Sequence, residues 1–101
     1  TITSFAAPIQ RAFRITQTGR IEMFWPEFFY TRSQDMEAAF HDAGQFYWGR
    51  TEAWKNMQPI FGSCSVPLIL PRWQAQDIDT EEDWEYASLM FQAWKKVESS
   101  T

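Results

Sequence analysis

Two short runs near the start of the chain alternate apolar and polar residues, which is the period of a β-strand with one covered face. They span residues 11–16 and 20–25, and Gly19 between them can take the positive φ that a tight turn needs. The pattern predicts a β-hairpin in which Arg14 and Glu22 pair across the strands. An exposed pair of this kind adds little stability.

Other apolar runs lack a clear alternation and predict further short elements. Residues 2–9 and 45–49 have an extended character. Residues 66–70 form an apolar run that is closed by Pro71, so we expect a buried strand there. Residues 36–40 fit a short helical turn.

Two helices follow from spacing and capping signals. Residues 50–57 fit a short helix with Thr51 as its N-cap. A longer helix is expected over residues 81–97, because Thr80 and Asp83 have the spacing of a capping box. Its apolar stripe consists of Trp84, Ala87, Phe91 and Trp94.

The order of these elements is mixed α/β: a hairpin, a strand, a short helix, a strand and a long helix. The chain has 101 residues, 45% of them hydrophobic, with six Trp and nine Phe. That aromatic content is high for so few strands. We therefore expect residues 1–101 to be a single partial domain that resembles the end of a larger α/β sheet more than a closed fold.

The charge and cysteine content of the chain limit the classes of function that it could have. The net charge is -4 and the basic residues are scattered, so nothing favours nucleic-acid binding. No apolar run reaches the length of a membrane span, and no signal-like leader opens the chain. The single Cys64 fits a reducing compartment, so we expect a cytoplasmic protein with an inert thiol. The first residue is Thr1 rather than Met, so we expect a processed product or a piece of a longer protein.

The strongest candidate chemistry is a pair of acids just before the long helix. Asp77 and Asp79 are two residues apart, so in an extended segment both face one side and Ile78 faces the other. Two carboxylates at the end of a strand suit Mg²⁺, which prefers oxygen ligands. The simpler alternative is that acids near a helix N-terminus only favour the helix dipole.

Other polar residues are weaker candidates. His41 precedes Asp42, and a structural or substrate-orienting role is favoured over that of a general base because adjacent residues rarely face each other. Arg11, Arg32 and Arg50 suit bidentate binding of a carboxylate, although a solvated surface charge is the ordinary reading of each.

A phosphate-cradling loop is not recognisable in this chain. The four glycines stand singly, at positions 19, 44, 49 and 62. Tyr47 lies in an aromatic run, for which packing in a core is the default expectation.

Several motifs occur in an order that is typical of one enzyme family. They are PIQRAF from position 8, GRIE from 19, RSQD from 32, HDAGQFYWG from 41 and DIDT from 77. This set resembles the latter part of the cytidylyltransferases that activate nonulosonic acids, namely the CMP-sialic acid synthetases (acylneuraminate cytidylyltransferases) and their bacterial relatives. The segments DAGQFYWGR and LPRWQAQDIDTEEDW most resemble the branch that handles pseudaminic acid. The resemblance covers nearly the whole chain.

The resemblance implies an enzyme that couples CTP to a nine-carbon α-keto acid, releases pyrophosphate and uses Mg²⁺. The implied fold is the C-terminal part of a nucleotide-diphospho-sugar transferase-like (Rossmann-like) sheet. Its inserted hairpin, over about residues 10–25, helps to form a homodimer. A sugar-site segment over about residues 32–49 precedes the metal segment and final helix at about residues 76–97. The phosphate loop with which the family opens has no match here, so we expect this chain alone to be inactive.

The resemblance also assigns roles to individual residues. Asp77 and Asp79 are implied to be metal ligands, and Asp79 also has the catalytic role. The implied substrate-binding residues are Arg11, Arg32, Gln34, Gly44, Gln45 and Tyr47. Gln45 stands where sialic-acid synthetases usually have a small apolar residue, which leaves the sugar open between pseudaminic and sialic-type acids. The alternative function is a non-catalytic dimerisation or binding module, favoured by the aromatic richness and the hairpin.

Overall fold

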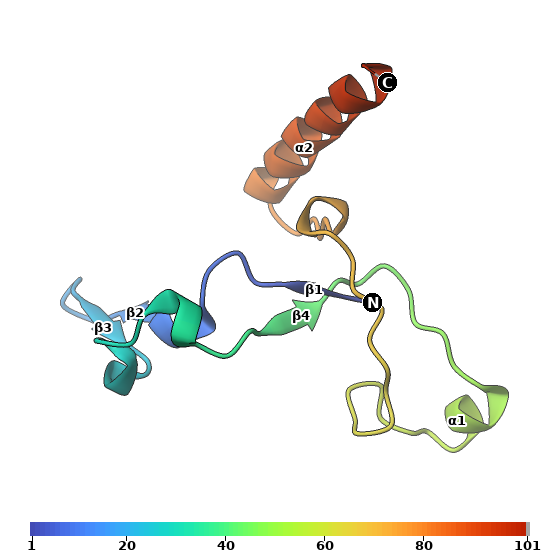
Figure 1. Cartoon of the computed structure of the whole chain (residues 1–101), viewed down its shortest axis with the longest axis horizontal. Coiled ribbons are helices and arrows are strands. Elements are labelled where there is room, and N and C mark those ends of the chain that lie inside the picture. Colours follow the sequence, from blue (N-terminus) through green and yellow to red (C-terminus); the bar gives the residue numbers. More distant parts are fainter. Residues whose placement is uncertain (101) are drawn as a thin grey trace. The chain divides into compact units, whose positions relative to one another are not determined.

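The computed structural model describes residues 1–100, and Figure 1 labels its main elements. The strands are β1 (Ile2–Ser4), β2 (Phe13–Ile15), β3 (Ile21–Met23) and β4 (Phe40–Asp42), and the α-helices are α1 (Thr51–Lys55) and α2 (Glu81–Ser99). Short 3-10 helices lie between them: η1 (Ile9–Arg11), η2 (Pro26–Phe28), η3 (Ser33–Asp35) and η4 (Arg72–Gln74). The chain forms two compact units, one of Ser4–His41 and one of Thr1–Thr3 with the residues from Asp42 onward.

The hairpin formed by β2 and β3 confirms the first prediction. The two strands are antiparallel, and Arg14 lies opposite Glu22. The Arg14 Nη1 and Glu22 Oε1 atoms are 2.8 Å apart, so the expected ion pair is present. Gly19 has a φ of 77°, which allows the tight turn between the strands. The Arg14 guanidinium also lies 4.3 Å from the centre of the Phe24 ring, which adds a cation–π contact.

Strand β1 brings distant parts of the chain together. It forms a second two-stranded sheet with β4. It also pairs in parallel with residues 68–70: the Ile2 N–H donates to the Leu68 carbonyl at 2.9 Å, and the Leu70 N–H donates to the Ile2 carbonyl at 2.8 Å. The Thr3 hydroxyl donates to the Leu70 carbonyl at 2.7 Å, so this strand is held by main chain and side chain alike.

The prediction of a buried strand over residues 66–70 is wrong. Ile69 forms one isolated bridge to Ile2, and Val66 is 90% exposed. Pro67 has no N–H to donate to a ladder. Within the described residues, β1 is the strand alongside this run, and the side chains of Val66, Leu68 and Ile69 are exposed.

The extended segments are also shorter than expected. Residues 45–49 form no strand, and the Gln45 N–H donates to the Thr1 hydroxyl at 3.3 Å instead of to a neighbouring strand. Strand β1 ends at Ser4 instead of continuing to residue 9: the chain bends at residues 6–7, and Pro8 then becomes the N-cap of η1.

Two helical expectations need correction as well. Residues 36–40 are not helical: the turn lies earlier, in η3, and the chain then becomes extended and enters β4. Helix α1 lies inside the predicted range of residues 50–57, but its N-cap is Arg50 and not Thr51, and the Arg50 side chain makes no capping bond.

Helix α2 begins where the sequence predicts. The Asp83 N–H donates to the Thr80 hydroxyl at 3.1 Å, and the Asp83 carboxylate accepts from the Thr80 N–H at 3.1 Å, which completes the capping box. The same carboxylate accepts from the Asp79 N–H at 3.0 Å. This backbone hydrogen bond from Asp79 is the main reason why the pKa of Asp83 lies below its ordinary value of 3.8, and the Thr80 hydroxyl lowers it further.

Very little of the described chain is buried. Thr3 (2% exposed) and Ala43 (5% exposed) are the buried side chains among those residues. Large apolar side chains are exposed in both units, among them Ile15, Tyr30, Trp48, Val66 and Leu89. The chain is therefore α/β as expected, but the described residues form two small sheets and a C-terminal helix and do not by themselves form a Rossmann-like sheet. None of the described helices is long and apolar enough to cross a membrane.

The capping carboxylate gives the first helix turn a dependence on pH. Because the folded pKa of Asp83 is lowered, its contribution to α2 is present above pH 3.8 and is lost as the pH falls below that value. Asp83→Asn keeps a hydrogen-bond acceptor but cannot ionise. We expect the chain to be more helical than this variant at neutral pH, by circular dichroism, and the difference to vanish under acid. A difference that stays constant across the acid range contradicts the assignment.

The exposed apolar side chains predict self-association of the isolated chain. Sedimentation velocity at rising concentration should reveal dimers or larger species. The matched variant Ile15→Thr with Ile21→Thr removes two opposed, exposed side chains of the hairpin while keeping β-branched residues. It should weaken association if the hairpin is the contact surface. A species that remains monomeric at high concentration contradicts the prediction.

Candidate metal and sugar site

The two acids of the predicted metal site lie in the link between η4 and α2. The Gln76 amide donates to the Trp73 carbonyl at 3.1 Å, which fixes the start of this link, and the bond from the Asp79 N–H to Asp83 fixes its end. Asp79 directly precedes the N-cap residue of α2. The backbone between the two anchors therefore holds both Asp77 and Asp79 near the start of the helix.

The side chains of Asp77 and Asp79 are both available for a ligand. Neither carboxylate has a hydrogen bond or ion pair within the part of the chain that the structure describes. Asp79 lines a shallow surface hollow together with Ile78, Thr80, Glu81 and Trp84. The described residues bring no cluster of three or more metal-ligating side chains together. Mg²⁺ is commonly held by one or two carboxylates with water and substrate phosphates, so two free carboxylates fit this ion.

A second group of predicted residues forms a turn after β4. Gly44 has a φ of 67°, in the left-handed region that favours glycine, and its N–H donates to Asp42 Oδ1 at 2.9 Å. The Tyr47 hydroxyl donates to the other oxygen of the same carboxylate. This hydrogen bond is the main cause of a raised pKa of Tyr47, and burial and the Asp42 charge act in the same direction.

The Gln45 side chain connects this turn to the segment that carries the acids. Its Nε2 donates to the carbonyl of Gln74 at 3.2 Å, and Gln74 ends η4, three residues before Asp77. Gln45 is thus tied at both its main chain and its side chain, since its N–H donates to the Thr1 hydroxyl. The structure therefore brings the turn after β4 into direct contact with the end of η4, which is distant in sequence and lies three residues before Asp77.

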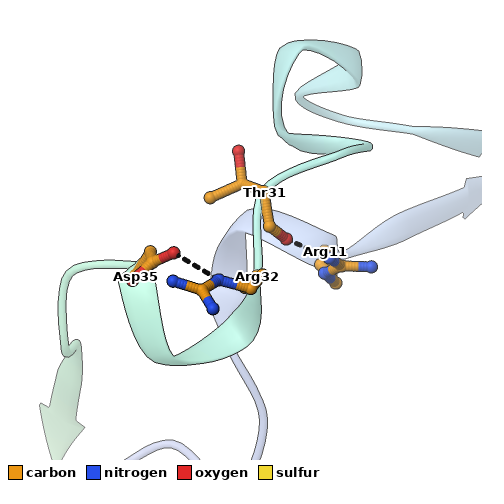
Figure 2. Close-up of polar contacts among 4 residues, drawn as sticks. All are labelled: Arg11, Thr31, Arg32 and Asp35. Carbon is orange, nitrogen blue, oxygen red and sulfur yellow. Dashed lines mark hydrogen bonds and ion pairs between the residues drawn. The ribbon is translucent and has the colours of Figure 1, made fainter.

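The two predicted arginines lie in the other unit and are close to each other in it. The Arg11 guanidinium donates to the carbonyl of Thr31, the residue before Arg32, and Arg32 Nε donates to Asp35 Oδ2 at 2.9 Å, as Figure 2 shows. The pair of Arg32 and Asp35 is largely exposed, so it contributes little stability. Gln34 lies in η3 between these two residues.

The predicted site residues therefore fall into two sets, each within one unit. Arg11, Arg32 and Gln34 share the unit that contains the hairpin. The other unit contains the remaining predicted residues, which are Gly44, Gln45, Tyr47, Asp77 and Asp79.

Two expectations about single residues change with the structure. Tyr47 is 41% exposed and is not a core residue. Its ring makes a T-shaped contact with the Phe61 ring, with 6.3 Å between the ring centres. His41 packs against the Phe5 ring at 4.9 Å, in line with a structural role. Adjacency in the sequence relates Asp42 only to His41, and the structure adds that its carboxylate accepts hydrogen bonds from Gly44 and Tyr47. The spacing of an Asp two residues before a Gly, typical of an Asx-turn, is the signal that would have found it.

Comparison with known proteins agrees with the motif order. Pseudaminic acid cytidylyltransferase of Campylobacter jejuni is 42% identical over 89 residues, which is 88% of this chain and 38% of that protein. A Helicobacter pylori protein named pseudaminic acid cytidylyltransferase and UDP-2,4-diacetamido-2,4,6-trideoxy-beta-L-altropyranose hydrolase is 33% identical over 95% of this chain, which covers 18% of its length. No protein-family profile matches the chain. The chain is thus homologous to a segment of these proteins and spans less than half their length, which is consistent with a C-terminal part.

Proposed function

We propose, from the premise that this chain corresponds to a segment of the pseudaminic acid cytidylyltransferases, that it forms the sugar-binding and metal-binding part of such an enzyme. The whole enzyme would transfer CMP from CTP to a nonulosonic acid and release pyrophosphate. Pseudaminic acid is the favoured sugar because it stands in the names of the matched relatives. A homodimer and a Rossmann-like nucleotide-binding sheet belong to the same proposal.

The observation that carries the proposal is the extent of the sequence match. A stretch of 89 residues in a chain of 101 must include residues 13–89, and so it spans both the sugar-site turn and the acid pair. The bond from Gln45 to Gln74 supports the same reading, because it joins the turn to the 3-10 helix that ends three residues before Asp77.

In this proposal the acids and the arginines would bind different groups. Asp77 and Asp79 would hold Mg²⁺, which offsets the charge of a bound triphosphate. Arg11 and Arg32 are suited to the carboxylate of the sugar, since a guanidinium binds a carboxylate through two parallel hydrogen bonds. Gln34 adds a neutral donor and acceptor beside Arg32. Catalysis would consist mainly of positioning and electrostatic stabilisation, with the sugar hydroxyl in line with the α-phosphate.

A non-catalytic dimerisation or binding module is the second candidate. The observation in its favour is the exposed apolar surface, which includes Ile15 and Ile21 on the hairpin. Both candidates predict association, so only an activity measurement separates them.

A chimera tests the proposal directly. This chain replaces the matched segment of the Campylobacter jejuni enzyme, and pyrophosphate release is measured with CTP, Mg²⁺ and pseudaminic acid. We expect the chimera to be active and this chain alone to release none, because its glycines stand singly and form no phosphate loop. A chimera that folds and binds CTP but transfers no CMP contradicts the proposed function. Turnover by this chain alone contradicts the expectation that the phosphate-binding part of the active site lies outside it.

The acid pair makes a sharper prediction in the same chimera. Asp79→Ala and Asp77→Ala should each lower kcat/KM by about 100-fold or more, because an electrostatic contact to the reacting phosphates is lost. The oligomeric state by sizing should not change. Glu82→Gln, an acid of the first turn of α2, is the matched control and should keep activity. Equal losses in all three variants would mean that the acids serve only the helix.

A further inference from the structure

Both oxygens of one carboxylate are used at the end of β4. Asp42 Oδ1 accepts the Gly44 N–H at 2.9 Å, and Oδ2 accepts the Tyr47 hydroxyl. The first bond closes an Asx-turn, in which a side chain replaces a backbone carbonyl. The second reaches across this turn to an aromatic ring. A single side chain thus links the backbone of the turn to the tip of Tyr47.

The turn needs this support because its backbone conformation is unusual. Gly44 has a φ of 67°, and no other atom would lie within 4 Å of a Cβ there, so no packing contact holds the turn at that position. The Asp42 carboxylate is the group that binds the Gly44 N–H itself, whereas the Ala43 and Gln45 N–H groups on either side donate to Thr1. Neighbouring Ala43 is one of the buried residues of the described chain, which fixes the position of the strand end from which Asp42 extends.

Tyr47 is restrained from two directions. Its hydroxyl is held by Asp42, and its ring makes a T-shaped contact with the Phe61 ring at an interplanar angle of 80°. A tyrosine side chain has two rotatable torsions, so one contact at the ring and one at the tip define where the hydroxyl lies. Of these two contacts, only the one with the Asp42 carboxylate fixes the direction of the Tyr47 hydroxyl, because the side chain is 41% exposed.

We propose that Asp42 is a positioning residue for sugar binding, which sets the Gly44 turn and the direction of the Tyr47 hydroxyl through its two carboxylate oxygens. The inference rests on the proposed function, which makes Gly44, Gln45 and Tyr47 the residues that meet the sugar. Asp42 itself acts through Tyr47 and the turn.

The contact can be tested in this chain without any activity. In a background of Tyr30→Phe and Tyr86→Phe, Tyr47 is the remaining tyrosine, and its ionisation is followed by tyrosinate absorbance. The pKa of Tyr47 should lie above 10.0, because Asp42 accepts the hydrogen bond of the protonated phenol and repels the phenolate. Asp42→Asn should lower it, whereas Glu22→Gln, a charge removed from the hairpin, should not. An unchanged pKa in Asp42→Asn overturns the inference.

The consequence for binding is tested in the chimera by a double-mutant cycle. Asp42→Asn and Tyr47→Phe should each raise the KM for pseudaminic acid about tenfold with little change in kcat, since each removes one link of the same contact. The double variant should be no worse than either single one. Additive effects, or a loss confined to kcat, overturn the inference. An inactive chimera with a normal Tyr47 titration would instead count against the proposed function alone.

Discussion

The parallel pairing of Ile2 with Leu68 and Leu70 is the contact on which the larger unit depends. Two backbone hydrogen bonds and the Thr3 hydroxyl join the first residues of the chain to a segment more than sixty positions away. Closing such a long loop costs entropy, and short strands recover little of it alone. Thr3 is the most buried polar residue among those described, and its burial shields these hydrogen bonds from water.

This pairing also explains why the apolar residues stay exposed. A parallel strand pair is stable mainly when helices or further strands cover both faces. Here the described residues offer β4 on one side of β1 and an isolated bridge on the other. Nothing within them covers Val66 or most of the apolar stripe of α2. The exposed surface is thus as apolar as a protein interior, but no further helices or strands of the described chain cover it. This agrees with homology to part of a longer protein.

The elements that could be predicted from sequence depend on local signals. The hairpin follows from alternation and from Gly19, and α2 follows from Thr80 and Asp83, all of which act within a few residues. The strands expected at residues 45–49 and 66–70 required distant partners, and hydropathy does not reveal whether those partners exist. In the candidate site, Asp77 and Asp79 stand out in the sequence because two carboxylates at close spacing are conspicuous, and their role as metal ligands stays a prediction. The contacts of Asp42 with Gly44 and Tyr47 could not be predicted from adjacency, because they depend on the conformation of the turn.

The hydrogen bond from the Asp79 N–H to the Asp83 carboxylate couples two processes that are usually separate. Starting a helix requires several residues to be ordered for a single backbone hydrogen bond. The two hydrogen bonds of the capping box offset part of that entropic cost. Because Asp79 takes part in the same network through its backbone, ordering the first turn of the helix also orders the acid that precedes it. Helix nucleation and the ordering of the backbone at Asp79 are therefore one event, and fraying at this helix end would disperse the acidic residues gathered there.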